Sequence, residues 1–270
     1  MIVISILDLL GYRFFQNAML GGVIAAAACA AVGLFLILKK EAMIGDGIAH
    51  TAFGGIALGL LLGINPLLGA LAVSVLAVLA ISYMRRRNVA PSDSAIAVML
   101  ALGFSFGLIV ISVVRGFNVE LFSYLFGSIL TIDEVDLLFV SLLGVVVLLF
   151  LGFFRRELLA MVFDEDDSRV MGVPTNTLSV AFDLLVAATI VLSIKVIGTV
   201  LVVALLVLPG LSALQLNLSF RKTILTAVGF SIASTVLGIL FSAFDVATSG
   251  VIVLVAVLLF LLTIAYKKLQ

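Results

Sequence analysis

The sequence predicts an all-α fold, a polytopic helical bundle embedded in a membrane, and three observations lead to it. Hydrophobic residues make up 64% of the 270 positions and charged residues only 11%, whereas soluble domains carry roughly 25% charged residues. Apolar runs of about 20 residues recur along the chain, each long enough to cross a hydrocarbon core as a helix. Basic residues gather in every second loop, and loops rich in Lys and Arg are typical of the cytoplasmic side of a membrane protein.

About nine apolar segments are expected to span the membrane, so that residues 1–270 form a single transmembrane domain. In chain order they are 17–38, 43–63, 66–84, 94–113, 135–154, 178–194, 196–216, 223–241 and 246–266. The sixth and seventh are separated by little more than Lys195, so their division is open. Segment 121–132 is apolar but too short to span, and we expect a short helix at the membrane surface.

The distribution of basic residues predicts the orientation. Twelve of the fifteen Lys and Arg residues lie in every second loop or at the carboxyl terminus: Lys39, Lys40, Arg85, Arg86, Arg87, Arg155, Arg156, Arg169, Arg221, Lys222, Lys267 and Lys268. We therefore expect a multi-pass protein of the plasma or inner membrane, with its amino terminus outside and its carboxyl terminus in the cytoplasm. The net charge of zero gives no field that would favour nucleic acid as a partner.

The second apolar segment begins with a polar pair, Asp46 and His50, and His50 is the only histidine in the chain. A carboxylate and an imidazole four residues apart project from one face of a helix, so both can reach a single cation. Residues 51–63 carry no charge, and polar groups are costly to hold near lipid. We expect the pair to be metal ligands that face a cavity or a partner. In the alternative, Asp46 caps the helix and His50 donates a hydrogen bond inside the bundle.

The sequence carries no nucleotide site or catalytic constellation that we recognise. It contains no G-x-x-x-x-G-K-[ST] P-loop, and its single histidine is already placed in the polar pair. We therefore predict that the chain is not itself an enzyme. It is a channel, a transporter driven by an ion gradient, or the membrane half of a machine whose motor is another chain.

The longest cytoplasmic loop, residues 155–177, favours the last of these. Asp164 and Glu165 open a run of four acidic residues, which favours the start of a short helix, and Gly172 and Pro174 favour its end. A short amphipathic helix on this face could insert into a groove of a soluble partner. The alternative is a solvated acidic loop without a partner.

Three residues in or beside the sixth and seventh spans have several interpretations. Lys195 pairs with an acid, lines the mouth of the pathway, or extends its ammonium group to the interface. Asp183 is expected to make a helix-packing hydrogen bond or to meet the cytoplasmic water layer. Pro209 interrupts the seventh span and produces a static bend or, in the alternative, a hinge for gating.

The sequence resembles a known family, the metal-type permeases of ATP-binding-cassette importers, which move zinc, manganese or iron(II). Four stretches carry the resemblance over nearly the whole chain: Met43-Ile44-Gly45-Asp46-Gly47-Ile48-Ala49-His50, Phe126-Gly127-Ser128-Ile129-Leu130, Asp164-Glu165 with Met171-Gly172-Val173-Pro174, and Lys195-Val196-Ile197-Gly198 with Ala204-Leu205-Leu206-Val207-Leu208-Pro209. The resemblance implies a helical importer bundle related to the cobalamin and siderophore permeases.

The resemblance also implies the rest of the machine. Two permease chains, expected to be identical, would form the pathway, and two cytoplasmic ATPase subunits would dock on the coupling residues Asp164, Glu165, Met171, Gly172, Val173 and Pro174. An extracellular metal-binding protein would deliver the ion. Asp46 and His50 would be pathway ligands for a transported divalent metal, with no cofactor bound permanently. Carboxylate oxygen and imidazole nitrogen suit manganese, iron(II) and zinc.

Three rival functions remain open. One is a secondary transporter, driven by an ion gradient, in which Asp46, His50, Asp183 and Lys195 act as relay groups. The second is a permease for a metal chelate such as cobalamin or a siderophore, which would need a wider cavity. The third is a structural membrane subunit.

Overall fold

The computed structural model describes residues 11–113, 124, 127, 132–242 and 246–269. In these ranges the chain forms helices and short connections, without a strand. The helices are α2 (Arg13–Leu38), α3 (Ile44–Leu62), α4 (Pro66–Arg86), α5 (Ser92–Val113), α7 (Glu134–Phe153), α8 (Arg155–Phe163), α9 (Glu165–Val170), α10 (Thr175–Ile197), α11 (Thr199–Gln215), α12 (Phe220–Phe241) and α13 (Thr248–Leu269). The all-α prediction is confirmed.

Within the described ranges, eight helices are long and apolar enough to cross a membrane: α2, α3, α4, α5, α7, α10, α12 and α13. The remaining predicted span, 196–216, corresponds to α11, which has 17 residues and is therefore about 25 Å long. The Lys267 ammonium donates to Gln215 Oε1 at 3.2 Å, so α11 ends beside the end of α13. The predicted surface helix at 121–132 falls largely outside the described residues.

The division between the sixth and seventh predicted spans was placed three residues too early. Lys195 lies in the last turn of α10, and the helix ends at Gly198, whose φ is 87° and ψ 156°. Glycine adopts a positive φ without the steric clash that a Cβ would cause. Backbone freedom at Gly198, rather than the charge of Lys195, therefore separates α10 from α11.

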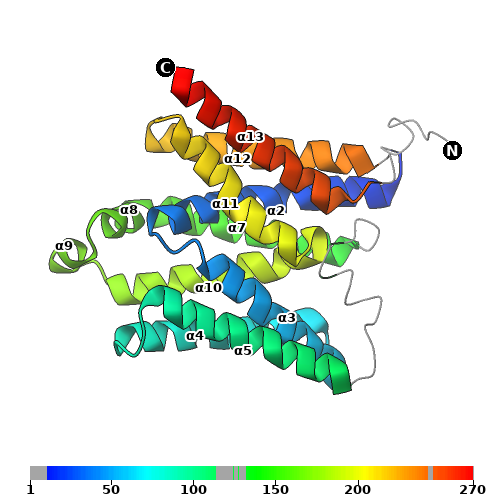
Figure 1. Ribbon diagram of the computed structural model, residues 1–270, viewed down its shortest axis with the longest axis horizontal. Helices are drawn as coiled ribbons and strands as arrows, with labels where there is room; N and C mark the ends of the chain where they lie inside the picture. Colours follow the sequence, from blue (N-terminus) through cyan, green and yellow to red (C-terminus); the bar gives the residue numbers. More distant parts are fainter. Residues whose placement is uncertain (1–10, 114–123, 125–126, 128–131, 243–245, 270) are drawn as a thin grey trace.

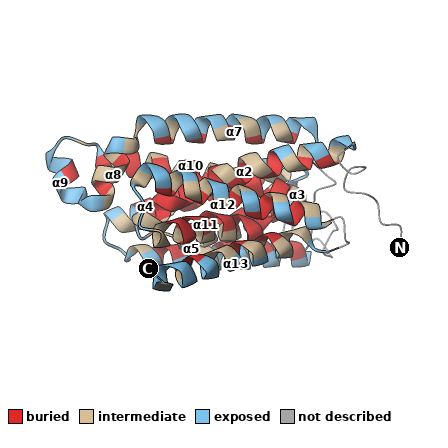
Figure 2. Ribbon diagram, turned by 90° about the horizontal axis from the view of Figure 1, so that it is seen from above, coloured by how far each residue is buried: buried red, intermediate tan, exposed pale blue. Residues whose placement is uncertain are grey.

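The long helices lie side by side along one direction, and α8 and α9 project beyond the end where the carboxyl terminus lies (Figure 1). At the opposite end, Arg13 and Glu134 form an exposed ion pair at 3.4 Å, which joins the start of α2 to the start of α7. Most of α2, α3 and α10 is buried, whereas α5, α7 and α13 expose apolar faces (Figure 2). Such faces are expected where helices meet lipid.

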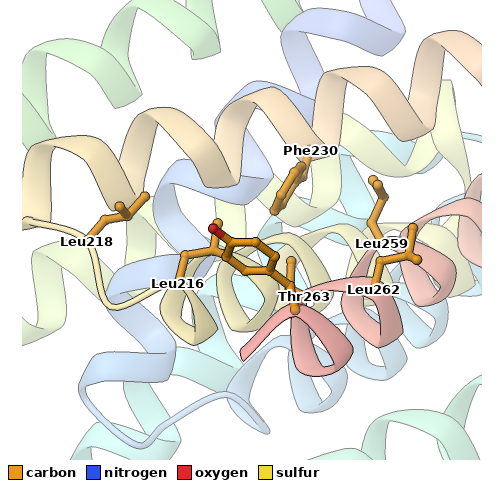
Figure 3. A pocket seen from close by; sticks show the side chains of 7 residues that line it. Leu216, Leu218, Phe230, Leu259, Leu262 and Thr263 are labelled. Atoms are coloured by element: carbon orange, nitrogen blue, oxygen red, sulfur yellow. The ribbon is translucent and has the colours of Figure 1, made fainter. Parts of the chain in front are cut away.

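An apolar pocket of ≈ 540 Å³ opens between α12, α13 and the connection after α11 (Figure 3). Its lining consists of Leu216, Leu218, Phe230, Leu259, Leu262, Thr263 and Tyr266. The lining offers two hydroxyl groups but no carboxylate or imidazole. Divalent transition metals prefer those ligands, so this pocket is not a candidate for the metal pathway.

Candidate metal-pathway site

Glycines allow α3 to pack against both α4 and α5 at close range. A Cβ built on Gly55 would lie 2.5 Å from the carbonyl oxygen of Gly69 in α4, and one on Gly54 would lie 2.5 Å from the carbonyl oxygen of Gly103 in α5. Contacts this short are forbidden to real side chains, so glycine is required for the three backbones to approach as they do. The three helices therefore form one tightly packed unit that fixes how α3 is turned.

In this orientation α3 leaves two neighbouring side chains partly accessible along an otherwise buried stretch. From Ile44 to Ala57 every residue is buried except Asp46 and His50, whose side chains are 37% and 39% exposed. His50 Nε2 lies 3.5 Å from Asp46 Oδ1, beyond the usual range of about 2.7–3.2 Å for a hydrogen bond. The two groups stand side by side and partly open, an arrangement in which both can turn toward a shared cation.

Neighbouring groups orient the pair. The ring of Phe104 in α5 meets the imidazole of His50 edge to face, with centroids 5.2 Å apart and planes at 81°, a favourable aromatic geometry. Asp46 lies in the first turn of α3, where the helix dipole favours negative charge. The N-cap position itself belongs to Met43, which makes no side-chain cap hydrogen bond, so Asp46 is not the helix cap.

The pair has too few donor groups for a complete metal site. In the described part of the chain, no group of three or more His, Cys, Asp or Glu side chains is placed to hold a metal ion. Structural zinc sites use four protein ligands and manganese prefers six-coordinate, oxygen-rich sites. A cation held by Asp46 and His50 would therefore need further ligands from water or another chain, and metal binding by the pair stays a prediction.

Lys195 pairs with an acid, which is one of the three interpretations of this residue. Its Nζ lies 2.6 Å from the carboxylate of the buried Asp136 in α7. Asp133 caps α7 by accepting a hydrogen bond from the backbone N–H of Asp136 at 2.7 Å. This hydrogen bond is the main reason why the pKa of the Asp133 carboxyl lies below its ordinary value. The ion pair of Lys195 and Asp136 thus joins the end of α10 to the start of α7.

Pro209 lies inside α11, which continues past it to Gln215. A Cβ on the neighbouring Gly210 would lie 2.7 Å from Cδ1 of Ile37, so this part of α11 packs closely on α2. The helix is not ended by the proline. Gating at Pro209 stays a prediction.

The short helix predicted in the loop 155–177 is present as α9, and it is preceded by a second short helix, α8. The Asp164 carboxylate caps α9 by accepting hydrogen bonds from the backbone N–H groups of Asp166 and Asp167 at 2.9 and 3.0 Å. Gly172, with φ 87°, turns the chain after α9, and Val173 and Pro174 lead into α10.

The residues predicted to couple to an ATPase lie on and beside α9, where apolar side chains are exposed. Glu165 begins the helix and pairs with Arg169. Met171 and Val170 lie at its other end and are largely exposed to solvent, as is Phe163 of α8. Exposed apolar side chains on a short helix are typical of a docking surface.

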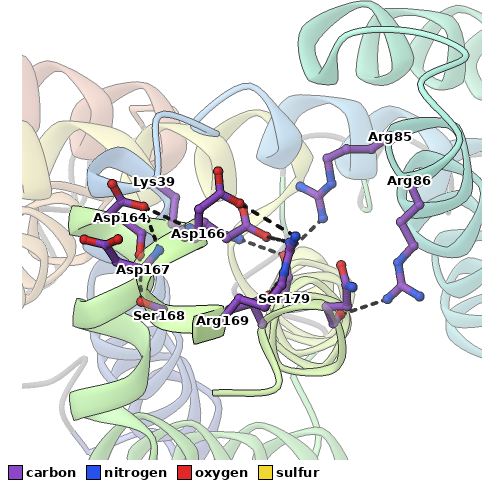
Figure 4. Close-up of polar contacts among 12 residues, drawn as sticks. Lys39, Arg85, Arg86, Asp164, Asp166, Asp167, Ser168, Arg169 and Ser179 are labelled. Atoms are coloured by element: carbon purple, nitrogen blue, oxygen red, sulfur yellow. Dashed lines mark hydrogen bonds and ion pairs between the residues drawn. The ribbon is translucent and has the colours of Figure 1, made fainter. Parts of the chain in front are cut away.

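Sequence reasoning missed a buried group of charges formed by Lys39, Glu41, Arg85 and Asp183. Figure 4 shows two of its members, Lys39 and Arg85, close to α9. Asp183 is buried against Arg85 and Lys39, so of its two expected roles the packing contact holds and exposure to water does not. The one signal for this group in the sequence is the position of its other members at predicted helix ends.

Comparisons with known proteins agree with this architecture. The manganese transport system membrane protein MntC of Halalkalibacterium halodurans is 33% identical over 264 residues, which cover 97% of this chain and 90% of the relative. The solved structure of PsaBC from Streptococcus pneumoniae in complex with Fab matches with a TM-score of 0.86 at 31% identity, covering 96% of this chain and 94% of that one.

A second solved structure, an inward-facing metal-chelate type ABC transporter, matches with a TM-score of 0.72 at 16% identity over 96% of this chain and 90% of that one, and supports the fold alone. The family model described as the ABC 3 transport family matches residues 11–267. Because this match covers nearly the whole length of the sequence, the chain belongs to the ABC 3 transport family.

Proposed function

We propose that this chain is the membrane-spanning subunit of an ATP-driven importer that carries a divalent transition metal ion, manganese, zinc or iron(II), into the cytoplasm. One observation carries the proposal. On a helix that is otherwise buried from Ile44 to Ala57, the two open positions hold a carboxylate and an imidazole. Polar side chains on an apolar membrane helix are costly, and a passing cation gives both groups a role.

The chemistry of the pair suits a transported ion. One carboxylate oxygen and one imidazole nitrogen bind manganese, iron(II) and zinc, and the absence of a thiolate ligand disfavours copper(I). A second identical chain, related by a two-fold axis, would bring a second Asp46 and His50 and raise the number of protein ligands to four. Such a site holds the ion only briefly: the ion gives up bound water for the protein ligands and then takes up water again as it leaves.

The motor and the delivery protein are separate chains in this proposal. Two cytoplasmic ATPase subunits dock on α8 and α9, where Asp164 and Gly172 fix the ends of the α9 helix and Met171 is exposed. An extracellular metal-binding protein docks at the opposite end of the bundle. That arrangement places the carboxyl terminus in the cytoplasm, in agreement with the basic residues near α8, α9 and the end of α13.

Two residues outside the pair have proposed roles in the pathway. Lys195 holds α7 to α10 near the outer mouth through Asp136, and this contact sets the width of the entrance. Pro209 leaves one backbone carbonyl of α11 without its helical donor, and the resulting weak point lets α11 bend when the pathway opens.

The experiment is metal uptake by the complex reconstituted with its ATPase in liposomes. We expect ATP-dependent uptake by the unaltered complex, and loss of uptake in His50→Ala and Asp46→Asn while the complex still assembles. Asp93→Asn is the matched control, because Asp93 lies in the first turn of α5 and is exposed. Normal uptake by His50→Ala rejects the ligand role, and uptake without the ATPase favours a gradient-driven transporter.

A further inference from the structure

Four charged side chains form a buried cluster at the end of the bundle that carries α8 and α9. Lys39 and Glu41 follow α2, Arg85 lies in the last turn of α4, and Asp183 belongs to α10. Their side chains are 10%, 13%, 25% and 1% exposed, in that order. Two cations face two anions, so the cluster is balanced in charge.

Each acid in the cluster contacts both bases. Lys39 Nζ lies 2.8 Å from Glu41 Oε2 and 3.6 Å from Asp183 Oδ1. Arg85 bonds Asp183 Oδ2 at 3.1 Å through Nη2 and Glu41 Oε1 through Nη1. Buried ion clusters contribute little net stability compared with apolar packing, and their best-supported use is to specify an arrangement or a switch. The cluster therefore needs an explanation beyond stability.

On one side the cluster is tied to the helix that carries the metal pair. The backbone carbonyl of Glu41 accepts a hydrogen bond at 3.0 Å from the N–H of Ile44, the first residue of α3. Asp46 follows two residues later, in the first turn of α3. A shift of Glu41 is therefore a shift of the start of α3.

On the other side the cluster is tied to the coupling segment. Arg169 of α9 donates to the hydroxyl of Thr175, the first residue of α10, at 3.4 Å. Ser179, one turn further along α10, accepts hydrogen bonds from Lys39 at 3.3 Å and Arg85 at 3.0 Å. Figure 4 shows Lys39 and Arg85 reaching toward Ser179.

A polar pocket separates α9 from the end of α4. It has a volume of ≈ 390 Å³ and is lined by Arg85, Arg86, Asn88, Glu165, Arg169, Asn176 and Ser179. The side chains of α9 and α4 thus face each other across open space rather than across packed atoms. The polar contacts beside this pocket join α4 to α10: Arg85 donates to Ser179 and Asp183, and Arg86 donates to the backbone carbonyl of Asn176 at 2.8 Å.

We propose that Lys39, Glu41, Arg85 and Asp183 form the joint through which movement of α8 and α9 on an ATPase reaches Asp46 and His50. Glu41 and Lys39 are positioning residues, because they act on the pair through the start of α3. This inference rests on the proposed function. Ionic contacts suit this role. Arg85 can move closer to Glu41 or to Asp183 while Lys39 still contacts the other carboxylate, so no buried charge is left unpaired.

The test uses Lys39→Met/Glu41→Gln in the full complex with its ATPase. This double variant removes the ionic contacts that hold Glu41, and through its backbone the start of α3, to the rest of the cluster. It leaves Arg85 paired with Asp183, so the buried charge stays balanced. We expect assembly and ATP hydrolysis to persist, while metal imported per ATP hydrolysed falls about tenfold, a typical coupling between sites. The matched control is Lys267→Gln, because Lys267 is exposed and its ammonium group bonds Gln215 rather than the cluster; it should leave the ratio unchanged.

A second variant decides the question if the double variant does not assemble. Glu41→Asp keeps the charge and shortens the reach by one methylene, and we expect a smaller fall in metal per ATP with normal assembly. An unchanged ratio in the variant that assembles, or uptake and ATP hydrolysis falling in parallel, overturns the joint. An unaltered complex that hydrolyses ATP but imports no metal overturns the proposed function, and the joint with it.

Discussion

The substitution Asp183→Asn tests whether the cluster is electrostatically balanced. Asp183 is 1% exposed and its carboxylate lies 3.1 Å from Arg85 and 3.6 Å from Lys39. The asparagine has nearly the same shape, so the change removes charge while keeping volume. It leaves two cations with only Glu41 between them.

The magnitude follows from these distances. At an effective dielectric constant of about 20, unit charges at 3.1 Å attract by roughly 5 kcal/mol before the cost of desolvation. Removing one partner of a buried pair typically costs about 3–5 kcal/mol. Glu41 still compensates part of the charge of Arg85 and Lys39, so we expect a loss near the lower end, about 3 kcal/mol in the free energy of unfolding.

The assay measures the free energy of unfolding of the purified protein in detergent, with unfolding induced by heat or by denaturant. Asp93→Asn, on the exposed first turn of α5, is the control and should change stability by no more than about 0.5 kcal/mol. The double variant Lys39→Met/Asp183→Asn leaves Arg85 paired with Glu41 and should recover part of the loss. A loss below about 0.5 kcal/mol for Asp183→Asn, or a double variant less stable than the single one, would refute the reasoning.

Three further predictions concern packing, capping and backbone conformation. Gly54→Val places a side chain against the carbonyl oxygen of Gly103, 2.5 Å from the new Cβ, and should destabilise the protein by at least about 1–3 kcal/mol in the same melting assay; Gly152→Ala, which meets no atom within 4 Å, should be close to neutral. Asp133→Ala removes the cap of α7 and should cost about 1 kcal/mol. Because the folded-state pKa of Asp133 is lowered, this stabilisation is present above its ordinary pKa and is lost as the pH falls through the lowered value, so the unaltered protein and the variant should converge in acid. Gly172→Val strains a backbone at φ 87° and should cost about 1–3 kcal/mol, measured by melting, whereas an equal stability would contradict the left-handed turn after α9.

Several local features could be predicted from short stretches of sequence. Asp164 as a helix cap and Gly172 as a helix end depend on backbone geometry within a few residues, so their residue types were sufficient evidence. The placement of Asp46 and His50 on one helix face depends only on the helical repeat. The division between α10 and α11 was misplaced because the charge of Lys195 was used as the signal, whereas the positive φ of Gly198 determines it.

The hydropathy of the chain by itself determined that the protein is a helical membrane bundle, because a run of apolar residues satisfies its backbone in lipid only as a helix. Tertiary structure alone decided which groups meet. The partial exposure of Asp46 and His50 on α3 depends on glycines that pack against α4 and α5. Lys195 pairs with Asp136, which lies 59 residues away in the sequence. The charged cluster likewise joins the ends of α2 and α4 to Asp183 inside α10. Hydropathy and helix caps depend on neighbouring residues, but the partner of a buried charge depends on how distant helices are turned and packed.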